Sequence, residues 1–118
     1  MDSEHLIQQK IQLYITQNNL GCCFRANVGS VKQADGRWFS TGLPNGYPDL
    51  HGTRWIDNQS YFIEVKSPTG KIRDDQMRFH QFLMQHNVIH GIARSVDDAK
   101  MIIQGGLVGY GYPDMEIE

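Results

Sequence analysis

Two carboxylates and a lysine lie in the part of the sequence with the clearest strand pattern. Side chains alternate across a strand, so Glu64 and Lys66 of "YFIEVKS" share one face. Asp49 opens the preceding strand pattern, "PDLHGTRWI", and a hairpin with its turn at "DNQS" would lay it beside Glu64. Carboxylates that converge at a strand end suit a hard divalent cation such as Mg²⁺, and a nearby lysine supplies a positive charge for water or phosphoryl oxygens. The pattern therefore predicts metal-dependent chemistry on a phosphate group.

A simpler interpretation of "EVK" is an ion pair within one strand, at the exposed end of a sheet. These three residues alone favour that interpretation. Asp49 shifts the interpretation toward a metal site. An ion pair with Lys66 accounts for one carboxylate at this position, but not for a second one beside it. Buried charges are costly unless they are paired or bind a metal.

The tetrapeptide "GYPD" occurs twice, at Gly46–Asp49 and at Gly111–Asp114. Pro-Asp is ordinary turn chemistry, because proline presets φ and aspartate hydrogen-bonds to nearby backbone. Only the first copy is followed by a strand that carries E-x-K. The second copy is therefore predicted to be a turn in the tail.

Helical and strand patterns alternate along the chain. Ser3 caps a first helix that ends near "NNLG", a second helix runs from Arg73 to Gln85, and a third follows Ser95 and stops at Gly105. Strand patterns occur at "CCFRANV", "RWFS", "PDLHGTRWI", "YFIEVKS" and "HGIARS". The predicted fold is α/β, a mixed β-sheet flanked by helices in the order α-β-β-β-α-β-α.

Length and composition indicate one soluble domain, residues 1–118, with the tail 106–118 as an extension or interface. No apolar run approaches the about 20 residues of a membrane span, and the first residues do not resemble a secretion signal. The adjacent Cys22 and Cys23 are interpreted as reduced thiols, so a cytoplasmic location in a bacterium or a phage-infected host is expected. The net charge of −2 argues against a protein that coats DNA without selectivity.

Pro48-Asp49 followed by Glu64-x-Lys66 resembles the PD-(D/E)XK nuclease signature. The surrounding motifs are similar to the VRR-NUC (virus-type replication-repair nuclease) branch of that superfamily. They are the Gly-rich approach "TGLPNGYPDL", the strand "FIEVKSPTGK", the glutamine-bearing helix "DDQMRFHQFL" and the glycine-led strand "HGIARSVDDA". The resemblance spans Ser3 to Ile103 and implies a restriction-endonuclease-like core.

The resemblance also implies roles for individual residues. Asp49, Glu64 and the backbone carbonyl of Val65 would bind the metal, Mg²⁺ or Mn²⁺, and no organic cofactor is expected. Lys66 would orient or help to deprotonate the attacking water, or stabilise the developing charge. Gln76 would lie near the site as a further catalytic residue.

Two of the implied site residues also have structural interpretations. Gln76 falls on the inward stripe of its helix with Ile72, Phe79 and Leu83, where an amide needs a partner, and a backbone group could be that partner. Glu4 is a candidate metal ligand, but the helix dipole favours an acidic residue in a first turn in any case.

Four basic residues are candidate DNA contacts: Lys32, Arg37, Lys71 and Arg73. The first two lie in a Gly-rich segment with Trp38 and Phe39, a mixture that suits phosphate contacts and stacking on bases. Aromatics that close the edge of the core, and charges that are simply solvated, are equally compatible with the pattern.

Together these features predict a metal-dependent, structure-selective DNA endonuclease. No base-reading motif is visible. Stand-alone members of the family resemble Holliday-junction resolvases, so a homodimer acting on four-way junctions, with roles in recombination, repair or phage replication, is implied. Leu107, Val108 and Tyr110 in the tail are candidate interface residues. The alternatives are a flap or fork endonuclease, and a non-catalytic DNA-binding module that retains the fold.

Overall fold

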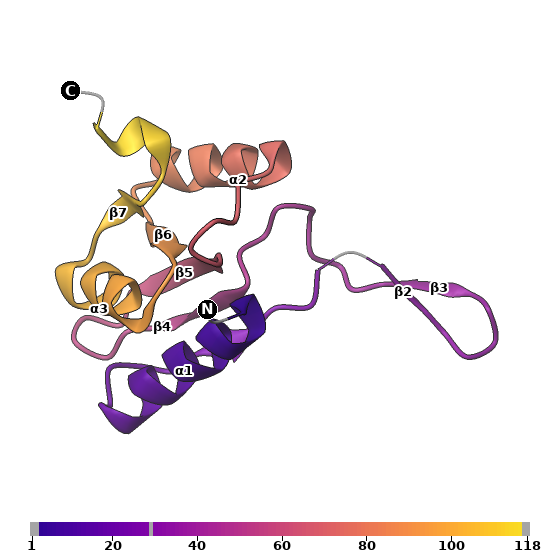
Figure 1. Ribbon diagram of the computed structural model, residues 1–118, viewed down its shortest axis with the longest axis horizontal. Coiled ribbons are helices and arrows are strands. Elements are labelled where there is room, and N and C mark those ends of the chain that lie inside the picture. Colours follow the sequence, from indigo (N-terminus) through magenta and orange to yellow (C-terminus); the bar gives the residue numbers. More distant parts are fainter. Residues whose placement is uncertain (1–2, 29, 117–118) are drawn as a thin grey trace.

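The computed structural model describes residues 3–28 and 30–116. Its centre is a five-stranded sheet with the order β1-β4-β5-β6-β7 (Figure 1). Strands β1, β4 and β5 are antiparallel neighbours, whereas β5, β6 and β7 run parallel. The strand bounds are Phe24–Arg25 for β1, Leu50–Thr53 for β4, Ser60–Val65 for β5, Ile89–Ala93 for β6 and Val108–Tyr110 for β7. The predicted α/β fold with a mixed sheet is confirmed, and β7 adds an edge strand that was not predicted.

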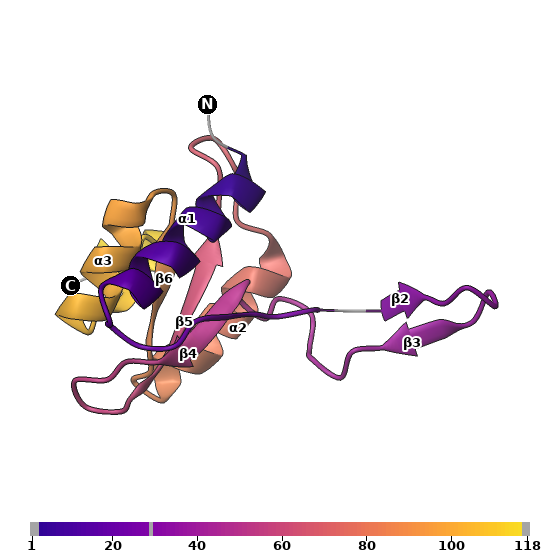
Figure 2. The same cartoon turned by 90° about the horizontal axis from the view of Figure 1, so that it is seen from below.

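Helices cover both faces of this sheet (Figures 1 and 2). Helices α1 (Glu4–Gln17) and α3 (Val96–Gly105) lie on one face, and α2 (Asp74–Gln85) lies on the other. The apolar core lies under α1 and α3. Its residues include Ile7, Ile11 and Ile15 of α1, Tyr61, Ile63 and Val65 of β5, and Ile102 and Ile103 of α3. Since side chains alternate along β5, Phe62 and Glu64 face α2 instead.

The helix ends follow local chemistry. Ser3 Oγ accepts a hydrogen bond from the Leu6 amide, and Ser95 Oγ accepts one from the Asp98 amide, so both predicted caps are confirmed. Helix α3 continues through Gly105, and Gly106 ends it with φ = 60°. The predicted end of this helix at Gly105 is confirmed, and the left-handed cap is the next residue.

The inner face of α2 differs from the predicted stripe. Leu83 is buried as expected, but Ile72 and Phe79 are only half-buried. Gln76 and His80 are the buried polar residues of this helix. The apolar pattern located the helix, and the polar residues turned out to face the sheet.

A second, two-stranded sheet projects from the body (Figures 1 and 2). Strands β2 (Ser30–Lys32) and β3 (Trp38–Ser40) pair antiparallel, with Lys32 opposite Trp38. The strand at "RWFS" was predicted, whereas its partner β2 was not. This hairpin contributes to a longest molecular dimension of 46 Å.

The chain ends in a short 3₁₀ helix, η1 (Pro113–Glu116). The second "GYPD" is therefore a turn that leads into η1, next to α2 in Figure 1. Within the described ranges, no helix combines the length and the apolar character that a membrane crossing requires.

Candidate active site

Asp49 and Glu64 meet where the predicted hairpin places them. Strand β4 pairs with β5 in the register Leu50 opposite Ile63, so the next residues along are Asp49 and Glu64. Oδ2 of Asp49 accepts a 2.8 Å hydrogen bond from the Val65 amide, and the charge of Asp49 acts on the neighbouring Glu64. Backbone pairing and this amide thus hold two carboxylates together at one end of the sheet.

Burial and charge both act on Glu64, whose exposed fraction is only 3%. Burial is the main reason that its pKa is raised to about 9, and the neighbouring Asp49 carboxylate adds to the effect. Positive charge from Lys66 and Arg73 acts in the opposite direction without cancelling it. Two adjacent carboxylates repel each other when both are ionised, and a bound divalent cation would offset this negative charge. These side chains therefore fit the role of metal ligands.

Gln76 is held at both ends of its amide. The Arg73 amide donates to Gln76 Oε1 at 3.0 Å, which fixes this atom as the oxygen because a backbone N–H can only donate. The opposite atom, Nε2, donates to Glu64 Oε2 at 2.8 Å. Both partners suggested by the sequence, the site and a backbone group, are therefore present.

Lys66 is buried beside the same carboxylate. Its exposed fraction is 5%, and its Nζ lies 3.8 Å from Glu64 Oε2. That distance permits an ion pair but exceeds a hydrogen bond.

The side chain of Glu4 lies near Lys66, at the loop that follows β5. A Cβ built on Gly70 would lie 3.2 Å from Glu4 Oε2, 3.2 Å from Ser67 Oγ and 3.4 Å from Lys66 Cδ. The first turn of α1 therefore packs against the loop after β5, close to Lys66.

A metal at this position would draw on few side chains. Within residues 3–28 and 30–116, no group of three or more histidine, cysteine or acidic side chains is arranged to hold a metal ion. Asp49 and Glu64 supply two carboxylates, so further ligands would be main-chain carbonyls, such as the predicted one of Val65, and water.

The predicted DNA contacts fall into two groups. Lys71 and Arg73 are exposed on the loop between β5 and α2, and the charge of Arg73 acts on Glu64. Lys32 and Arg37 lie on the projecting hairpin, where Arg37 is paired with Asp35 at 2.8 Å. The structure thus places Arg73 near the site, Lys71 on the same loop, and the other two on the hairpin.

Other polar residues near α2 were missed: His80, His90, Tyr112 and Asp114. One signal was available, because His80 follows Gln76 by four residues and so occupies the same helix face. The link to the tail had no such signal.

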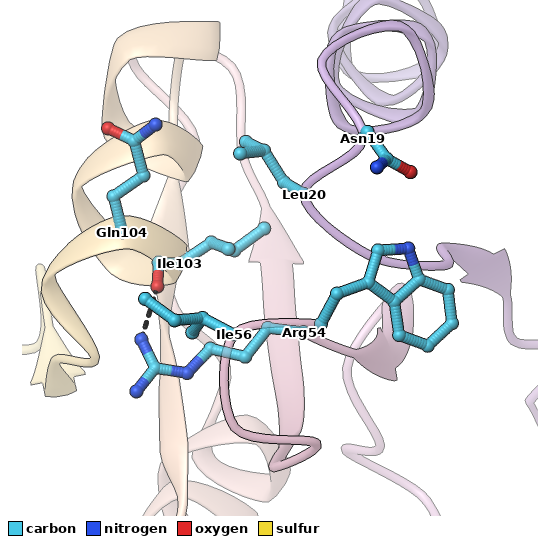
Figure 3. Close-up of a pocket in the computed structure, with 7 residues that line it drawn as sticks. Asn19, Leu20, Arg54, Ile56, Ile103 and Gln104 are labelled. Carbon is cyan, nitrogen blue, oxygen red and sulfur yellow. Dashed lines mark hydrogen bonds between the residues drawn. The ribbon is translucent and has the colours of Figure 1, made fainter.

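A pocket of about 530 Å³ lies at the opposite end of β5, between the end of α1, the turn after β4 and the end of α3 (Figure 3). Arg54 crosses this region and donates to the Ile103 carbonyl at 2.7 Å, which closes the end of α3. Asp57 holds the other edge of the same guanidinium. Arg54 thus serves to hold the end of α3 in this region. The pocket shares no residue with the carboxylate cluster.

The VRR-NUC domain family model matches residues 2–97. A solved structure described as a VRR_NUC domain has a similar fold, with a TM-score of 0.58 at 19% sequence identity. This likeness covers 87% of the present chain and 97% of the other. None of the curated proteins matches the chain. Because the family model covers most of the sequence, the chain belongs to the VRR-NUC family of nuclease domains.

Proposed function

We propose that this protein is a Mg²⁺- or Mn²⁺-dependent endonuclease that hydrolyses phosphodiester bonds in DNA. Membership of a nuclease family indicates the reaction class and DNA as the substrate. The observation that carries the proposal is the group of Asp49, Glu64 and Lys66 at one end of β5, in which Glu64 and Lys66 are buried and Asp49 is half-buried. A module that only binds DNA has no need for a buried carboxylate beside a second, half-buried one, because this arrangement costs stability.

Each residue of the site has its own proposed role. Asp49 and Glu64, with the Val65 carbonyl, would hold a divalent cation, which supplies charge neutralisation at the phosphate and lowers the pKa of a bound water. Lys66 places its ammonium group beside Glu64, where it stabilises negative charge on the attacking water or the phosphoryl oxygens. Gln76 keeps Glu64 in one orientation.

Glu4 is a further candidate in this group. Its carboxylate lies against the loop that carries Lys66. There it would act as an additional ligand through water, or as a partner that orients the lysine. Substitution of Glu4 should therefore affect metal dependence less than substitution of Asp49.

The projecting hairpin and the loop after β5 form the proposed DNA surface. Trp38 and Phe39 are 68% and 55% exposed, and Lys32 lies opposite Trp38. A two-stranded sheet is marginal by itself, and these rings have neither a core nor a helix to cover them. We infer that the hairpin binds DNA, while Lys71 and Arg73 contact the phosphates nearest the carboxylates.

The proposed substrate is a branched DNA, with the four-way junction preferred over a flap or a fork. A small domain without a base-reading motif has to select shape instead of sequence. Paired cuts across a two-fold symmetric junction require paired sites, so a C₂ homodimer is part of the proposal. Strand β7 forms the edge of the sheet and carries Val108 and Tyr110, with Leu107 just before it, which makes this edge the proposed interface.

The proposal is tested by cleavage of labelled four-way junction, flap, nicked and linear duplex DNA, each with Mg²⁺, with Mn²⁺ and with EDTA. Wild-type protein should introduce two symmetric nicks in the junction when metal is present. Lys66→Ala should bind the junction and cleave it at least about 100-fold more slowly, because a transition-state charge loses its partner. Lys100→Ala, an exposed lysine of α3, is the matched control and should cleave normally.

The other outcomes identify the alternatives. Cleavage confined to flaps or forks would retain the nuclease and reject junction resolution. Binding without cleavage under every metal condition would favour the non-catalytic module. A monomer in sedimentation at working concentrations, with and without junction DNA, would contradict the dimer.

A further inference from the structure

Helix α2 presents two buried polar side chains to the sheet, one helical turn apart. Gln76 is 4% exposed and holds Glu64, and His80 is 1% exposed. Residues at i and i+4 share a helix face, so whatever fixes His80 also fixes the neighbouring turn that carries Gln76.

A chain of hydrogen bonds holds His80. The Val88 carbonyl can only accept, so Nδ1 of His90 donates to it, at 2.7 Å. Nε2 of His90 then accepts from His80 Nδ1, also at 2.7 Å. Nε2 of His80 faces both carboxylate oxygens of Asp114, at 2.7 and 3.0 Å. This order makes Nδ1 of His80 a donor, and Asp114 is the partner of its other nitrogen.

The second "GYPD" supplies two parts of this arrangement. Its Tyr112 ring stacks on His80, with centroids 3.8 Å apart and planes inclined by 8°. Gly111 turns the chain with φ = 82°, close to Ile92 of β6, so that Tyr112 and Asp114 both reach α2. The turn therefore holds the helix in addition to reversing the chain.

The first "GYPD" contacts the same helix. Gly46 has φ = 86°, and a Cβ placed on it would lie 2.2 Å from the Asp75 carbonyl. Tyr47 packs on Phe79 with ring centroids 5.2 Å apart. Since Phe79 and His80 are neighbours, the two copies of the tetrapeptide hold adjacent residues of one helix.

We propose that Tyr112 and Asp114 form a C-terminal latch whose role is to position Gln76, and through it Glu64, by holding α2 at His80. The effect on cleavage rests on the proposed nuclease function, whereas the effect on the Gln76 side chain does not. The family match ends at residue 97, so the latch lies outside the matched residues.

Two observations favour positioning over stability alone. Apolar side chains would stabilise the contact between α2 and the tail at least as well as the contact of buried His80 with half-buried Asp114, so its directional hydrogen bonds serve orientation. Tyr112 also lies close to the site: burial is the main reason that the pKa of its hydroxyl is raised, and the charges of Glu64 and Asp49 add to the effect.

The test is a double-mutant cycle on junction cleavage. Asp114→Ala should lower kcat about ten-fold with KM changed less than about two-fold, because a misplaced Gln76 affects the reaction and not DNA binding. In the Gln76→Ala background the same substitution should cost less than about two-fold, since the residue that it acts through is already gone. Asp114→Asn keeps a hydrogen-bond partner for His80, so its kcat should lie between those of the wild type and Asp114→Ala. Asp97→Ala, which removes an exposed carboxylate from α3, is the control and should leave kcat unchanged.

A second readout does not need activity. In ¹H–¹⁵N spectra near neutral pH, His90 should show one protonated nitrogen, and Asp114→Ala should shift the Gln76 side-chain amide signals while Asp97→Ala does not. Equal loss of kcat in both backgrounds, or unmoved Gln76 signals in a folded Asp114→Ala protein, would overturn the latch. If wild-type protein cleaves nothing, the nuclease proposal fails on that result, and the Gln76 signals alone decide for or against the latch.

Discussion

Glu64 carries the largest electrostatic cost at the site. It is almost fully buried beside Asp49, and its pKa is raised to about 9 mainly by burial. In the unfolded chain the same carboxyl group is ionised and hydrated at neutral pH. Folding without a cation must therefore retain a proton at this position, which lowers the free energy of unfolding.

Glu64→Gln should consequently raise the free energy of unfolding in EDTA by about 1–3 kcal/mol, because the amide has nearly the same shape and no charge to desolvate. It should also abolish cleavage and the extra stability conferred by Mg²⁺. Urea denaturation with and without Mg²⁺ measures both effects. Asp97→Asn, an exposed acid, should change stability by less than about 0.5 kcal/mol. A less stable Glu64→Gln protein in EDTA would contradict the account of the site.

His90 gives a prediction about pH. Burial is the main reason that its pKa is lowered from 6.5 to about 4, with His80 adding to the shift and Val88 and Asp114 opposing it. Tyr112 is the other ring that faces it. Because the unfolded chain binds this proton at higher pH than the folded one, stability contributed by neutral His90 is present above pH 6.5 and is lost as the pH falls toward 4.

The loss should amount to roughly 3 kcal/mol in the free energy of unfolding. Urea denaturation at several pH values between 4 and 7 measures it. His90→Gln lacks the titrating group, so its stability should change less over this interval than that of the wild type. Identical pH profiles for the two proteins would refute the assignment.

At the level of elements, the position of α2 depends on a close approach of backbone to backbone. Gly46 adopts φ = 86°, and an added Cβ would lie 2.2 Å from the Asp75 carbonyl at the start of α2. The same region carries Arg73, whose amide holds Gln76. A side chain at position 46 would therefore displace the end of the helix that carries a site residue.

Gly46→Ala should lower the free energy of unfolding by at least about 2 kcal/mol, combining strain at positive φ with the clash. Gly42→Ala is a matched control, because Gly42 also has φ = 86° but its Cβ would meet nothing within 4 Å. The control should cost only about 1 kcal/mol. Thermal or urea denaturation of both variants isolates the clash, and equal losses would show that the contact with α2 is unimportant.

At the level of the whole molecule, the hairpin and the carboxylate cluster are separate parts, for which we propose separate roles. Figures 1 and 2 show β2 and β3 well away from the helices. Trp38 is 68% exposed, so removing its ring takes nothing from the core. The hairpin should therefore affect DNA binding without affecting stability.

Trp38→Ala should weaken the affinity for junction DNA about ten-fold, in line with the value of one base–aromatic stack, and should change the free energy of unfolding by less than about 0.5 kcal/mol. Fluorescence anisotropy with labelled junction, in Ca²⁺ to prevent cleavage, measures the affinity. Trp55→Ala is the matched control, since this half-exposed ring lies in the turn at the opposite end of β5. Equal affinities for all three proteins would remove the hairpin from the DNA surface.

Much of the core could be predicted because its signals are local. Strand alternation in "YFIEVKS" and a turn at "DNQS" are enough to place Asp49 beside Glu64, and the observed register of β4 and β5 agrees. Ser3 and Ser95 marked helix starts, since a cap depends only on residues within one turn. Gln76 was expected near the site, and its contact with Glu64 fits the inward position that its helix gives it.

The sequence by itself determined the helices, the central hairpin and the chemical types gathered in "GYPD" and "EVK". Only the tertiary structure decided what the second "GYPD" does. His80 and Asp114 are 34 residues apart in the sequence. Tyr112 contacts His80 because β7, which precedes it, pairs at the edge of the sheet. The physical reason is that a local pattern is set by backbone geometry over a few residues, whereas a contact between distant segments depends on how helices and strands pack together.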